Sequence, residues 1–89
     1  MDLLTVDFET YYDKDYSLKK LTTEEYIRDP QFEVIGVAVK KNEEATLWAS
    51  GSMTQLYAWL NSSFDWKSSA VLCHNTLFDG AILSWVFDI

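Results

Sequence analysis

The sequence predicts an α/β fold in which helices flank a mixed sheet. Apolar, β-branched segments at 3–10, 32–39 and 70–73 indicate strands, and a shorter one follows at 45–49. Apolar residues at helical spacing in 53–61 separate the last strand from the others. A helix in that position permits a crossover connection, so we expect the last strand to run parallel to the first. We expect the two middle strands to form an antiparallel hairpin beside it.

The segment after the first strand contains a loop and a short helix. Residues 11–20 are polar and aromatic without a clear period, which is typical of a loop. The acidic start of 22–28 predicts a helix, with Thr22 or Thr23 as its N-cap. Pro30 disfavours helical backbone at the residue before it, so the helix should end there.

The middle of the chain predicts a hairpin followed by an amphipathic helix. We expect the hairpin to span 32–49, with its turn at 40–43, where polar residues replace the apolar alternation. Ser52 is suited to cap the helix 53–61.

The last part of the chain predicts a strand and a final helix. Residues 70–73 are apolar on both faces, so we expect a buried strand of the kind found at the centre of parallel sheets. A helix over about 77–87 should follow, capped by Asn75 or Thr76. Its spacing predicts one shared apolar face, formed by Phe78, Ile82 and Trp85.

Composition indicates one small domain over 1–89 and excludes several classes of protein. A hydrophobic content of 48% excludes a disordered chain, and no apolar run is long enough to cross a membrane. The single cysteine, Cys73, cannot form an internal disulfide, and no basic leader precedes the first strand, so we expect a cytoplasmic protein. A net charge of −7 disfavours strong DNA binding through basic residues, but it permits a nuclease whose metal ions supply positive charge.

Three carboxylates are candidates for chemistry. Asp7 and Glu9 are separated by one residue of the first strand, so they share a face, roughly 6–7 Å apart along the backbone. They suit a divalent metal ion, or they belong to a solvated strand face. Asp79 falls in the first turn of the final helix, which follows the end of the last strand. It is either a third ligand or a residue that caps the helix, and the spacing leaves both open.

These residues lie in two motifs. Asp-Phe-Glu-Thr at 7–10 and His-Asn-Thr-Leu-Phe-Asp at 74–79 resemble the first two motifs of the DEDD 3′–5′ exonucleases, Asp-x-Glu-Thr and His-Asn-x-x-(Tyr/Phe)-Asp. Between positions 11 and 39, Tyr-Ser-Leu, Thr-Thr-Glu-Glu-Tyr-Ile and Phe-Glu-Val-Ile-Gly-Val are similar to the proofreading domain of bacteriophage family A DNA polymerases. The resemblance covers nearly the whole chain.

The resemblance implies a ribonuclease H-like fold and hydrolysis of the terminal phosphodiester at a single-stranded DNA 3′ end. Two Mg²⁺ or Mn²⁺ ions would serve as cofactors. Asp7 matches the ligand that bridges the two metals, Glu9 the ligand that also contacts the attacking water, and Asp79 the ligand of the second metal. Positions near the terminal nucleotide are matched by Thr10, Asn75 and Phe78.

One family motif is missing from the printed sequence. The third motif is Tyr or His, three residues, then Asp, and it supplies the fourth carboxylate and a group that positions the water. We therefore expect an N-terminal part of the exonuclease domain, incomplete at the C-terminus and inactive or weak alone, in a bacterial host that carries or is infected by a phage. Its partner would be the remainder of a polymerase chain or a copy of itself in a homo-oligomer. The alternative is a non-catalytic oligomerisation or partner-binding module derived from the same fold.

Other residues suggest simpler roles. We expect His74 to end the last strand rather than act as a base, and Cys73 to be a small buried hydrophobic residue. The tryptophans are spaced like core or interface residues rather than base-stacking ones, whereas Tyr11 and Tyr12 directly follow the first motif and are better placed to contact a nucleotide.

Overall fold

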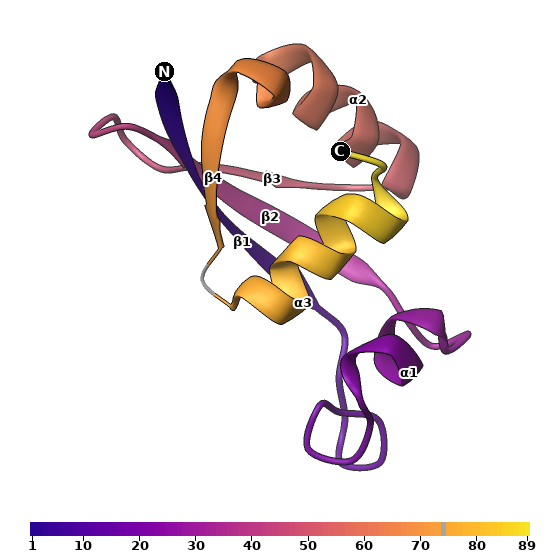
Figure 1. The fold of residues 1–89 in the computed structure, drawn as a ribbon. Coiled ribbons are helices and arrows are strands. Elements are labelled where there is room, and N and C mark those ends of the chain that lie inside the picture. The colour runs from indigo at the N-terminus through magenta and orange to yellow at the C-terminus, as the bar shows by residue number, and fades with distance from the viewer. Residues whose placement is uncertain (74) are drawn as a thin grey trace.

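Four strands form one mixed sheet in the order β3-β2-β1-β4 in the computed structural model (Figure 1). β1 (Asp2–Thr10) pairs antiparallel with β2 (Val34–Lys41), which pairs antiparallel with β3 (Leu47–Ser50). On its other side β1 pairs parallel with β4 (Ser69–Cys73). The predicted α/β class, the hairpin and the parallel last strand are confirmed.

Helical segments occupy the connections and the end of the chain. The structure describes residues 1–73 and 75–89. Within these ranges, no helix is long and apolar enough to cross a bilayer. The helical segments are α1 (Thr23–Arg28), α2 (Met53–Ser63), the 3₁₀ turn η1 (Trp66–Ser68), α3 (Thr76–Ala81) and the π-helical turn η2 (Ile82–Val86).

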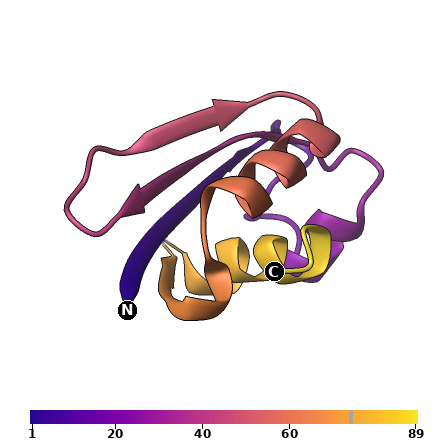
Figure 2. The same cartoon turned by 90° about the horizontal axis from the view of Figure 1, so that it is seen from above.

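The helices cover one face of the sheet and leave the other open (Figure 2). The core lies between the sheet and the helices, where Phe8 of β1 stacks on Phe87 at a ring-centroid distance of 5.6 Å. On the opposite face, which we call the outer face, apolar side chains remain accessible: Leu3 is 43% exposed, Trp48 53% and Leu72 53%. Strand alternation places Asp7 and Glu9 on this same outer face, because Val6 and Phe8 point into the core.

Short local motifs begin the helices α1 and α2. Thr22 caps α1 and Ser52 caps α2, and each forms a capping box in which its side chain accepts a backbone N–H three residues on. Glu25 and Gln55 complete these boxes by accepting the N–H of the cap residue. Both predicted caps are therefore confirmed.

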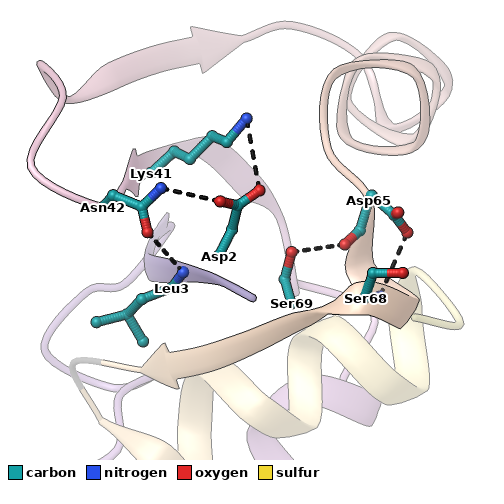
Figure 3. Close-up of polar contacts among 7 residues, drawn as sticks. All are labelled: Asp2, Leu3, Lys41, Asn42, Asp65, Ser68 and Ser69. Atoms are coloured by element: carbon teal, nitrogen blue, oxygen red, sulfur yellow. Dashed lines mark hydrogen bonds and ion pairs between the residues drawn. The ribbon is translucent and has the colours of Figure 1, made fainter.

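Polar contacts fix the starts of β1 and β4 (Figure 3). The Leu3 backbone N–H donates to Asn42 Oδ1 at 2.9 Å, and Asn42 Nδ2 donates to Asp2 Oδ1 at 3.0 Å. Asn42 turns the hairpin with φ 52°, a left-handed conformation that asparagine tolerates. Before β4, the Asp65 backbone carbonyl accepts the hydroxyl of Ser69 at 2.7 Å. These contacts set where the strands enter the sheet.

The burial predicted for the last strand is wrong. β4 is an edge strand that pairs only with β1 among the described residues, so Ala70, Val71 and Leu72 are exposed. The hairpin boundaries also shift, because β2 continues to Lys41 before the chain turns.

The face predicted for the final helix is wrong in part. Phe78 and Ile82 are buried, but Trp85 is exposed, and its ring centroid lies 5.5 Å from the Arg28 guanidinium. The π-helical turn is the reason: the Phe87 backbone N–H donates to the Ile82 carbonyl, five residues back, which rotates the later residues. Leu83 and Phe87 are buried instead.

Candidate functional site

Asp7 and Glu9 lie side by side on the outer face of β1. In the register with β2, Asp7 is opposite Ala38 and Glu9 is opposite Gly36. Asp7 is half-buried and Glu9 is exposed. The prediction that the two carboxylates share a strand face is therefore confirmed.

Asp79 reaches the same strand from the helix-covered side. It is 1% exposed, and its Oδ1 accepts the backbone N–H of Phe8 at 3.0 Å while its Oδ2 accepts the backbone N–H of Asn75 at 2.8 Å. Among the described residues, the pairing of β1 with β4 extends as far as Val6 and Cys73, whereas Phe8 pairs with Val37 of β2 on the other side of β1. On the β4 side, the Asp79 carboxylate accepts the Phe8 N–H.

Phe8 is the residue between Asp7 and Glu9, so this contact joins the two motifs of the sequence. The hydrogen bond spans 71 residues of the chain. Of the two roles that the sequence left open for Asp79, the structure shows the one at the helix start, because its carboxylate accepts the Asn75 N–H beside α3. The same carboxylate also lies against the strand that carries Asp7 and Glu9.

The three carboxylates do not form a closed metal cage. Across 1–73 and 75–89, no three His, Cys, Asp or Glu side chains gather closely enough to hold a metal ion. The geometry gives the reason, since Asp79 approaches β1 from the core side with both oxygens engaged, whereas Asp7 and Glu9 face outward. The residues present fit a divalent cation only in part: Asp7 and Glu9 offer hard oxygen ligands that water and phosphate oxygens would have to complement.

The other predicted site residues surround the end of β1. The Tyr26 hydroxyl donates to the Tyr11 carbonyl, so Thr10 Oγ1 donates to the Tyr26 oxygen at 2.9 Å. Asn75 caps α3 by accepting the Phe78 backbone N–H at 3.4 Å. The Phe78 ring packs edge-on against Tyr26, with ring centroids 5.7 Å apart. These hydrogen bonds and ring contacts hold the end of β1 and the start of the loop after it against α1 and α3.

A hollow of about 640 Å³ opens at this point, between the end of β1 and the loop that follows it. Three predicted residues, Glu9, Thr10 and Phe78, line the hollow together with Tyr12. Sequence reasoning missed the lysines that share this lining, which are Lys14, Lys19 and Lys20. Their signal in the sequence is density, because three of the seven basic residues fall within 14–20.

The loop is held in shape by Asp13 and Tyr16. The Tyr11 hydroxyl donates to Asp13 at 2.7 Å, and with the backbone N–H groups of Asp15 and Tyr16 it holds the pKa of that carboxyl below its usual value. The Tyr16 ring stacks on Tyr26 at 4.4 Å, and burial raises the pKa of the Tyr16 phenol to about 12.

A second hollow, of about 690 Å³, lies between β4 and the helices and contains none of the predicted site residues. Its wall is mostly apolar and includes Trp66, Val71 and Leu83. Cys73 lines it and is half-buried rather than fully buried, and burial raises the pKa of its thiol. His74, for which we expected a structural role, lies outside the described residues.

Comparison with protein-family models, with curated proteins and with solved structures finds no match to this chain.

Proposed function

We propose that this chain is part of a ribonuclease H-like 3′–5′ exonuclease domain, of the proofreading kind found in phage-type DNA polymerases. The observation that carries the proposal is the hydrogen bond from the Phe8 backbone to the buried carboxylate of Asp79. It brings the second sequence motif against the first, at the residue between Asp7 and Glu9. The mixed sheet, with its hairpin and its parallel strand, is compatible with this fold.

The residues divide into those that would meet the substrate and those that position them. Asp7 and Glu9 present carboxylate oxygens on the outer face and would hold Mg²⁺ or Mn²⁺. Such a cation, when bound, would polarise a phosphate and lower the pKa of a bound water. Asp79 accepts the Phe8 N–H of β1 and the Asn75 N–H at the start of α3, so it fixes the end of β1 to that helix and thereby fixes where Asp7 and Glu9 point.

We expect the isolated chain to hydrolyse DNA weakly. The third motif, which would supply a fourth carboxylate and a group that positions the water, is absent from the sequence. General-base assistance alone is commonly worth about 10²–10⁴-fold in rate. Cation binding is therefore the sharper test of the site than turnover.

The test follows Mn²⁺ by the broadening of backbone amide signals in an isotope-labelled chain. The proposal expects the amides of residues 7–10 to broaden first, and expects Asp7→Asn or Glu9→Gln to abolish this. Glu44→Gln, an exposed carboxylate in the hairpin turn, is the matched control and should leave the broadening at 7–10 unchanged. Broadening spread over all exposed carboxylates, or unaltered in Asp7→Asn, would sink the proposal.

A second candidate function is a non-catalytic assembly module. The observation that favours it is the outer face, where Leu3, Trp48 and Leu72 stay exposed, next to the edge of β4 that pairs with no strand among residues 1–73 and 75–89. Sedimentation velocity separates the two candidates. An assembly module forms a stable oligomer that Leu72→Lys disrupts, and it shows no localised Mn²⁺ broadening.

A further inference from the structure

The hollow at the end of β1 carries charge opposite to that of the whole chain. Lys14, Lys19 and Lys20 line it, although the net charge of the protein is −7. Lys20 Nζ lies 3.7 Å from the Asp15 carboxylate, whereas Lys14 and Lys19 form no ion pair with any residue in 1–73 or 75–89. The hollow therefore gathers cationic side chains on an acidic molecule, which favours an anionic ligand there.

Two carboxylates share this lining, and one of them is already engaged. Asp13 accepts the Tyr11 hydroxyl at 2.7 Å and the backbone N–H groups of Asp15 at 2.9 Å and Tyr16 at 2.7 Å. These bonds fold the loop and occupy the oxygens that a lysine would otherwise meet. Glu9 is the remaining carboxylate of the lining, and it is also one of the two residues of the candidate cation site.

Aromatic rings complete the hollow. Tyr26 and Phe78 form its inner wall, and Tyr12 is 74% exposed on its lining. Lysines that neutralise phosphates, together with aromatic rings on which bases stack, are the combination by which proteins bind single strands without reading their sequence.

We propose that the lysine loop, residues 12–20, binds the last nucleotides of a single-stranded polynucleotide. Phosphates meet Lys14 and Lys19, and a base stacks on Tyr12. A strand suits the hollow better than a single nucleotide, because two lysines without carboxylate partners offer two phosphate contacts. The identity of the strand as a 3′ end rests on the proposed function, but this binding needs neither the cation nor hydrolysis.

The test measures binding of a short 5′-fluorescein oligothymidylate by anisotropy, with EDTA present to remove metal ions. Lys14→Gln/Lys19→Gln is compared with Lys40→Gln/Lys41→Gln, which removes the same charge from the hairpin. Lysine contributes about 0.7 per phosphate contact to the salt slope on single strands, so the loop variant should lose about 1.4 of that slope between about 20 and about 200 mM salt. The hairpin variant should keep the wild-type slope. Tyr12→Ala should weaken binding at least about fivefold, through the loss of one stacked base.

Three results would overturn the inference. They are absence of binding by the wild-type chain, equal losses in the two lysine variants, and displacement by thymidine monophosphate at the same nucleotide concentration as the oligomer. Circular dichroism of each variant guards against unfolding, and the exposed positions of Lys14 and Lys19 make that outcome unexpected. Because EDTA removes metal, none of these results bears on the Mn²⁺ test, so the two proposals fail separately.

Discussion

Replacing Asp79 by Asn tests whether this carboxylate holds the end of β1. The side chain is 1% exposed, and each of its oxygens accepts one backbone N–H, at 3.0 Å from Phe8 and 2.8 Å from Asn75. An amide has one oxygen to offer, so one N–H keeps a neutral acceptor and the other meets an NH₂ group. Asp79→Asn therefore loses a hydrogen bond and leaves a buried donor without a partner.

The cost follows from these contacts. A hydrogen bond to a charged group contributes about 1.5–3 kcal/mol, and a buried unsatisfied donor costs about 1–3 kcal/mol. Because the two figures describe the same lost contact in part, their sum is an upper bound, and we expect Asp79→Asn to lower the free energy of unfolding by about 2–4 kcal/mol. A chain of 89 residues has a total stability of only about 4–13 kcal/mol at 0.05–0.15 kcal/mol per residue. The Tm should fall by about 8–30 °C, at roughly 4–8 °C for each kcal/mol.

Urea denaturation followed by tryptophan fluorescence measures this loss, and amide hydrogen exchange locates it at Phe8 and Asn75. The matched control is Asp65→Asn, at the exposed cap of η1, where the amide oxygen can still accept the Ser68 N–H. Asparagine caps about as well as aspartate, so the control should stay within about 0.5 kcal/mol of wild type. If Asp79→Asn also stays within about 0.5 kcal/mol, with Phe8 still protected from exchange, the carboxylate does not hold the strand and the reasoning fails.

Three further predictions concern the scaffold around the site. Burial raises the pKa of Tyr16 from 10.0 to about 12, so the stability that the neutral phenol contributes is present below pH 10.0 and is lost as the pH rises toward about 12. Tyr16→Phe should therefore flatten the dependence of the free energy of unfolding in urea on pH over this interval. An unchanged pH dependence would count against burial as the cause. At Gly36 a Cβ would overlap Trp48 Cζ2 and would lie 2.7 Å from the Ala49 carbonyl oxygen. Gly36→Ala should therefore cost about 1–3 kcal/mol and shift the Trp48 fluorescence. A neutral effect on both would refute the close packing. Thr22→Ala removes the capping box of α1 and should cost about 1 kcal/mol in thermal unfolding, whereas Thr22→Ser should restore most of the loss if capping is the cause.

Local signals in the sequence were enough to predict most of the fold. The alternation in β1 and the caps at Thr22 and Ser52 involve residues within a few positions of each other, so they do not depend on the rest of the chain. The parallel pairing of β4 followed from the intervening helix, which leaves few connections open.

The errors came from features that distant contacts or an irregular turn decide. A run of four apolar residues fits a central strand or an edge strand, and only the arrangement of the other strands makes β4 an edge. The predicted face of the last helix assumed uniform spacing, but η2 inserts a wider turn, which exposes Trp85 and buries Leu83.

The candidate site was predictable in its carboxylates and not in its lysines. Asp7 and Glu9 are fixed by strand alternation, whereas the contact between Asp79 and Phe8 needs the tertiary structure. Lys14 and Lys19 lie in a loop without periodicity, and they reach the same hollow because the loop folds around Asp13.

The most direct measurement of the central claim is the affinity for a single-stranded 3′ end with and without Mn²⁺. A terminal phosphorothioate slows cleavage, so binding can be read alone. If Asp7 and Glu9 hold the cation that receives the terminal phosphate, Mn²⁺ should tighten binding of the wild-type chain and should have no such effect on Asp7→Asn or Glu9→Gln. Equal tightening in all three proteins, or no effect of Mn²⁺ on the wild type, would contradict an exonuclease site at the end of β1.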